Sequence, residues 1–82
     1  NVGPLVEKAM EERNSVLHTE EGETELVDGV SEMLKSYTIG PIVANGDPIG
    51  AVVILSKDKV LGEVEHKAVE TDASFLARQM EQ

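Results

Sequence analysis

The sequence contains no cysteine and no tryptophan, and its 82 residues include only one tyrosine and one phenylalanine. Without cysteine the chain cannot form disulfides, bind zinc through thiolates or use a thiol as a nucleophile. A chain of this length buries only ~60–65% of the surface that its unfolded form exposes. Its fold must therefore be stabilised by a small core, without covalent cross-links.

Long apolar runs are also missing. The longest one, residues 49–55, is far shorter than the ~20 residues that a membrane-spanning helix needs. Residues 1–13 have no basic segment followed by an apolar one, so they are not expected to be a signal peptide. The absence of an initial methionine leads us to expect that the chain was excised from a longer protein. The absence of cysteine fits a cytoplasmic location.

Basic side chains are scarce, with 7 Lys and Arg against 16 Asp and Glu and a net charge of −9. Proteins that bind nucleic acid neutralise phosphates with a basic patch or stripe, which this chain lacks. We therefore expect no direct binding of DNA or RNA by this chain. An anionic membrane surface would repel it as well, so no membrane partner is expected.

The apolar pattern predicts a helix at each end of the chain and strands between them. Helices are expected at residues 4–14 and 62–81, where apolar residues recur at helical spacing. Strands are expected at residues 15–19, 24–29, 35–44 and 49–56, with a turn at Gly22 and a loop at 30–35. This order indicates an α+β fold with an antiparallel sheet packed against helices.

The two longest strands are expected to form a hairpin. Asn45 and Gly46 form the strongest short-range hairpin signal, because both residues tolerate a positive φ. Asp47 and Pro48 follow at once, so the loop is expected to be longer than two residues. Pro41 cannot donate a backbone hydrogen bond, which predicts an edge or an irregularity at that point of the strand.

The strand at 49–56 does not alternate between apolar and polar residues. A strand without alternation is typical of a position that is covered on both faces, in the middle of a sheet. No further strand follows it before the last helix. Either the earlier short strands flank it, or its neighbour is missing from this chain.

The pattern Pro-Ile-x-x-x-Gly-x-x-Ile-Gly-x-x-x-apolar at residues 41–54 resembles the central hairpin of GAF domains. The helix that contains "FLARQM" resembles the closing helix of that fold. Residues 36–58 and 62–82 are, over their whole length, similar to the C-terminal domain of AbrB-type transcription regulators of spore-forming bacilli.

This resemblance implies that residues 1–82 form a single, partial GAF-like domain that lacks the first strands of the full fold. In the family those strands lie beside the strand that matches 49–56. The DNA-binding domain of the parent protein would be absent from this chain. The implied function is signal sensing and oligomerisation in a cytoplasmic regulator of the forespore, which activates or represses genes. The alternative is a structural oligomerisation module without a ligand.

Tyr37 and Thr38, just before the bend at 40–41, are the candidate ligand-pocket residues. A tyrosine can stack on a ligand and donate a hydrogen bond to it, although an ordinary half-buried strand tyrosine is the alternative. His18 and His66 have no metal-ligand spacing and are expected to be ordinary polar residues, with a metal or proton-sensing role as the alternative. The acidic stretch at 20–25 is expected to be solvated, with calcium binding as the alternative, although it has no EF-hand spacing.

The pattern contains no phosphate-binding loop and no pair of carboxylates in a recognisable pocket. No catalytic residue, cofactor or metal site is therefore expected, and the chain is not expected to be an enzyme. The expected partners are further copies of the parent, as a dimer or tetramer, and an unknown small-molecule effector.

Overall fold

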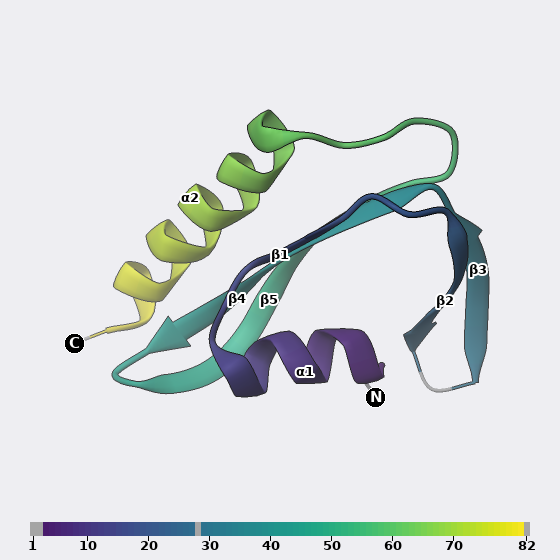
Figure 1. Ribbon diagram of the computed structural model, residues 1–82. Coiled ribbons are helices and arrows are strands. Elements are labelled where there is room, and N and C mark those ends of the chain that lie inside the picture. The colour runs from purple at the N-terminus through teal and green to yellow at the C-terminus, as the bar shows by residue number, and fades with distance from the viewer. Residues whose placement is uncertain (1–2, 28, 82) are drawn as a thin grey trace.

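Two helices lie on opposite faces of a small antiparallel sheet, as Figure 1 shows. The computed structural model describes residues 3–27 and 29–81. In chain order the elements are α1 (Pro4–Glu12), β1 (Val16–His18), β2 (Gly22–Val27), β3 (Val30–Leu34), β4 (Ser36–Ala44), β5 (Asp47–Ser56) and α2 (Glu63–Met80). The expected α+β class with antiparallel strands is confirmed, and both helices lie where the sequence places them.

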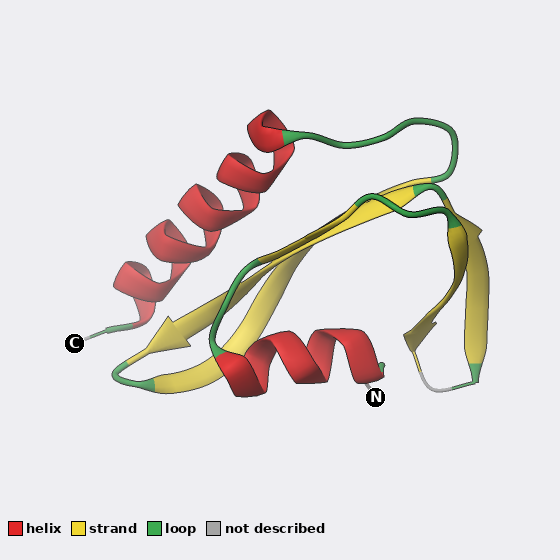
Figure 2. Ribbon diagram, in the orientation of Figure 1, coloured by secondary structure: helices red, strands yellow, loops and turns green. Residues whose placement is uncertain are grey.

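The strands form two units (Figure 2). β1, β4 and β5 form a three-stranded sheet in the order β1-β4-β5, and β2 pairs only with β3 in a separate two-stranded ribbon. The ribbon extends from the end of the sheet where β4 begins. All strand pairs are antiparallel.

The β4–β5 hairpin has a two-residue turn. Its pairing runs from Ser36 with Ser56 to Ala44 with Asp47, with one irregularity after Ile42. Asn45 and Gly46 therefore form the turn, at φ values of 54° and 83°. The expected longer loop is wrong, because Asp47 already pairs with Ala44.

Pro41 lies in β4 beyond the reach of β1, whose last pair is Val16 with Ile39. Within the described residues, β4 is therefore paired at Pro41 on one side alone, with Ala51 of β5, and proline is found at such edge positions. The expectation of an edge position at Pro41 is confirmed.

The expected loop at 30–35 and the expected turn at Gly22 are both wrong. Gly22 is the first residue of β2 and pairs with Leu34 at the end of β3. Met33 is exposed and Leu34 is buried, which is the alternation of a strand. Pairing with β2 overrides the helix-forming tendency of these two residues. The expected strand at 24–29 matches part of β2, and residue 28 lies outside the described residues.

β5 is an edge strand among the residues that the structure describes. β1 pairs with β4, and β2 with β3, so the earlier strands do not flank β5. Ile49, Val53 and Leu55 remain 47%, 39% and 44% exposed. The expected position in the middle of a sheet is wrong for the described residues, because β5 pairs there with β4 alone. The expected cover on both faces is wrong too, because the face with Ile49, Val53 and Leu55 stays partly exposed.

Successive residues of β4 face α1 and α2 alternately. Tyr37 and Ile39 join Ala9 of α1 in a buried cluster. On the other face, Gly40 lies directly beneath Val69 of α2, and a Cβ built on Gly40 would be 2.7 Å from the Val69 carbonyl oxygen. Only glycine permits this close approach of helix and strand.

Candidate functional site

An apolar cavity of about 200 Å³ lies between α1 and the sheet. Leu5 and Val6 of α1 form one wall, and residues of β2, β4 and β5 form the rest. The full lining consists of Leu5, Val6, Thr24, Glu25, Tyr37, Ile39, Val53 and Leu55. A second cavity of about 180 Å³ shares Leu5, Tyr37 and Ile39 with it and extends along α1 toward Glu12. The two cavities therefore adjoin each other under the helix.

Tyr37 is the polar side chain that both cavities share. It is buried, and its ring stacks on His18 with a centroid distance of 4.8 Å and an interplanar angle of 12°. Burial raises the pKa of the Tyr37 hydroxyl above its usual value. The phenol therefore stays protonated at neutral pH and is able to donate a hydrogen bond.

Thr38 lies on the other face of the sheet, beneath α2. Adjacent residues of a strand point to opposite faces, so Thr38 and Tyr37 do not line one cavity. Thr38 is buried, and its hydroxyl donates to the Val16 carbonyl at 2.7 Å. The same oxygen lies 3.2 Å from Nδ1 of His66.

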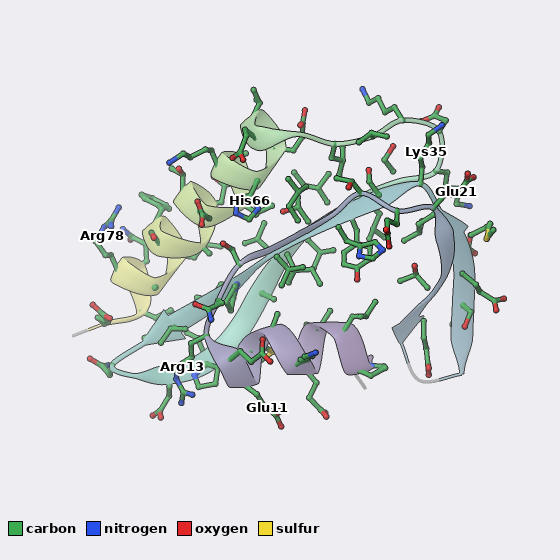
Figure 3. The ribbon with its side chains drawn as sticks, viewed as in Figure 1. Glu11, Arg13, Glu21, Lys35, His66 and Arg78 are labelled. Carbon is green, nitrogen blue, oxygen red and sulfur yellow. The ribbon has the colours of Figure 1, made fainter. Side chains whose placement is uncertain are left out.

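His66 is the centre of a polar cluster that sequence analysis missed. Figure 3 shows its ring on the side of α2 that faces the sheet. Its Nε2 lies 3.2 Å from Oγ of Ser15, and the Ser15 hydroxyl donates to Glu70 at 2.5 Å. The hydrogen bond from Ser15, and to a smaller degree the charges of His66 and Lys67, lower the pKa of the Glu70 carboxyl, against the effect of desolvation.

The sequence contains little signal for this cluster. Ser15 is 51 residues from His66 and 55 from Glu70, so no local pattern links them. The one local clue is the i, i+4 spacing of His66 and Glu70 on α2, whose side chains approach to 3.5 Å.

A wider, open cavity of about 530 Å³ lies on the α2 side of the sheet, next to this cluster. Ser15 and Glu70 line it, and so do both arginines of the sequence, Arg13 and Arg78. The Arg13 guanidinium donates to the carbonyls of Gly46 and Glu11, at 3.0 and 3.1 Å. Arg13 thus ties the end of α1 to the tip of the β4–β5 hairpin.

Within residues 3–27 and 29–81, no three His, Asp or Glu side chains are grouped closely enough to hold a metal ion. In the same ranges, no helix combines the length and the apolar character that crossing a bilayer requires.

Comparison with known proteins identifies relatives of this chain. The family model described as "Stage V sporulation protein T C-terminal, transcription factor" matches residues 1–81. Stage V sporulation protein T of Bacillus subtilis (strain 168) is 61% identical over 82 residues, which cover all of this chain and 46% of that protein. The chain thus spans about half the length of the relative that it matches. It belongs to the family of the C-terminal domain of stage V sporulation protein T, a family of transcription factors.

Proposed function

We propose that this chain is a non-catalytic, signal-sensing module of a sporulation transcription regulator. The observation that carries the proposal is the pair of adjoining cavities between α1 and the sheet, which share Tyr37. Ligand pockets are typically apolar with a few polar groups that orient the ligand. A small, largely apolar molecule with one hydrogen-bond acceptor for the Tyr37 hydroxyl fits this lining.

α1 is the element through which a ligand would act. Ala9 is the one fully buried residue of α1, and the N-cap residue is a glycine, Gly3, which has no side chain with which to cap the helix. A ligand beneath α1 would favour those positions of the helix that leave room for it. Through Arg13 and the hairpin tip, a shift of α1 would reach the far end of the sheet. In the parent protein this would change how separate DNA-binding domains are presented.

The test is a thermal-shift screen of metabolites and nucleotides. A ligand at tenfold excess over its Kd should raise the melting temperature by about 5–10 °C. Val53→Trp places an indole in the cavity, so it should abolish the shift. Met33→Trp adds the same side chain to an exposed position outside the cavity and should preserve it. Continued absence of any stabilising compound, with self-association intact, would contradict the sensor function.

A structural oligomerisation module is the second candidate, and the exposed edge of β5 favours it. An unpaired strand with apolar side chains is a template for pairing with another chain. We therefore propose that the parent self-associates as a dimer or tetramer, and that this isolated chain associates through β5. Val53→Lys should weaken this association, whereas Met33→Lys on β3 should not. A wild-type chain that stays monomeric by light scattering at high concentration would contradict this candidate.

The remaining parts of the proposal concern the parent protein. A regulator of forespore genes acts in the forespore cytoplasm, and its contact with DNA would be made outside this chain, whose net charge is −9. Absence of this chain's parent from the forespore would contradict the proposed location.

A further inference from the structure

The hydrogen bonds around His66 fix the number of protons that the cluster must contain. The Thr38 hydroxyl has one proton, which it donates to the Val16 carbonyl at 2.7 Å. Its contact with Nδ1 of His66, at 3.2 Å, therefore needs a proton on the ring nitrogen. One side of the imidazole is thus a donor.

The other ring nitrogen of His66 also needs a proton. The Ser15 hydroxyl donates its proton to Glu70 at 2.5 Å, so its oxygen can only accept from Nε2 of His66, at 3.2 Å. Both ring nitrogens then have protons, which describes the imidazolium ion. We infer that His66 is protonated in this arrangement, and that its protonation state decides whether the Ser15 hydroxyl donates to Glu70 or to His66.

Another proton arrangement would satisfy the same contacts. Glu70 would hold the proton and donate to Ser15, while Ser15 donates to a neutral His66. Carboxyl groups titrate roughly two pH units below imidazole, and the hydrogen bond from Ser15 lowers the pKa of Glu70 further. The charged pair is therefore the favoured form.

The carboxylate of Glu70 lies 3.5 Å from Nε2 of the ring. It lies on α2, one turn after His66, and Lys67 on the same helix influences it. From the loop before β1 and from β4, the ring faces the neutral hydroxyls of Ser15 and Thr38. Arg13 and Arg78 line the cavity that Glu70 also lines. Their positive charges disfavour the protonated form of His66, but less directly than the negative charge of Glu70 favours it.

When the His66 ring loses one proton, the acceptor of the Ser15 hydroxyl changes. Thr38 still requires a proton on Nδ1, so Nε2 becomes the acceptor. Ser15 must then turn its proton away from Glu70 and toward Nε2, and Glu70 loses both its donor and its counter-charge. The side chain of Glu70 is 43% exposed, against 19% for His66, so Glu70 is free to turn to water. The hydrogen bond between Ser15 and Glu70 is therefore lost, while Ser15 stays bonded to His66.

The direction of the pH effect follows from this scheme. The hydrogen bond from Ser15 to Glu70 accompanies the protonated ring, so it should be present at acidic pH and lost when the ring gives up its proton.

The test is an NMR titration of the intact chain from about pH 5.5 to 8.5, across the range in which histidines titrate. In the wild type, both His66 ring nitrogens should show the imidazolium state at the acidic end. The NMR chemical shift of the Glu70 carboxyl carbon should change as His66 titrates. In Ser15→Ala this change should be at least twofold smaller, because the hydroxyl that connects the two groups is gone. His18→Gln is the control, since His18 stacks on Tyr37 on the opposite face.

Two outcomes of the titration in the wild type decide against the inference. A neutral His66 ring in the folded chain at about pH 5.5 would overturn the inference, because histidine is otherwise largely protonated there. A Glu70 carboxyl carbon whose chemical shift stays constant while His66 titrates would overturn the inference too. Both of these observations use the wild type, so they do not depend on the folding of a variant.

Discussion

Gly40→Ala should be among the most damaging single-methyl changes in this chain. The new Cβ would lie 2.7 Å from the carbonyl oxygen and 2.9 Å from the carbonyl carbon of Val69. Both atoms belong to the backbone of α2, so no side chain can turn aside to make room. The helix itself must move away from β4, and with it the buried side chains of Val69, Ala73 and Ala77.

The magnitude follows from this geometry. Overpacking a well-packed site costs about 1–3 kcal/mol, and a backbone clash falls at the upper end, at about 2–3 kcal/mol. A chain of this length is stable by roughly 4–12 kcal/mol in total. With an m-value of about 1 kcal/mol per molar urea, the midpoint should fall by roughly 2–3 M.

Gly50→Ala is the matched control, because it adds the same methyl group to the neighbouring strand. There the Cβ would meet only Cδ1 of Ile42, at an ordinary distance of 3.5 Å. This variant should be neutral or more stable by a few tenths of a kcal/mol, since alanine restricts the unfolded chain. Urea unfolding followed by circular dichroism measures both variants. If they unfolded at the same midpoint, the close packing of α2 on β4 would be refuted.

Three further changes test other parts of the structure. Gly46→Ala should cost about 1 kcal/mol in urea unfolding, because Gly46 has a φ of 83°, and an unchanged midpoint would contradict the turn geometry. The backbone N–H of Gly62 donates to the Glu65 carboxylate at 2.7 Å, and this hydrogen bond lowers the pKa of that carboxyl. The stabilisation from the hydrogen bond is therefore present above the ordinary pKa near 4.5 and is lost as the pH falls. Glu65→Gln should therefore reduce the loss of stability between neutral and acidic pH, and an identical pH profile would count against this cap. The ion pair of Lys57 with Glu32 is exposed, so Lys57→Ala should leave the urea midpoint unchanged, and a clear fall would show that the pair matters more than its exposure indicates.

Sequence reasoning succeeded where the signal is local. The two helices and the β4–β5 hairpin follow from apolar spacing and from Asn45-Gly46, which act over a few residues. It failed at β3, where pairing with β2 decides the structure, and at β5, whose apolar residues do not reveal which neighbours the chain supplies.

The same limit applies to the candidate site. Tyr37 was singled out for its chemistry, and it lies at the wall of the apolar cavities. Thr38 was paired with it as a neighbour in sequence, although the alternation of a strand separates their faces. Ser15, His66 and Glu70 come together only through tertiary structure, so their cluster has no continuous motif.

The open edge of β5 also affects the colloidal behaviour of the chain. Its apolar side chains attract a second copy at short range, while the net charge of −9 on each copy repels it at longer range. The Debye length shrinks from ~30 Å at 0.01 M salt to ~8 Å at physiological ionic strength, which weakens the repulsion but not the apolar contact. Under the proposed association through β5, added salt should therefore favour association of the chain rather than its dispersal.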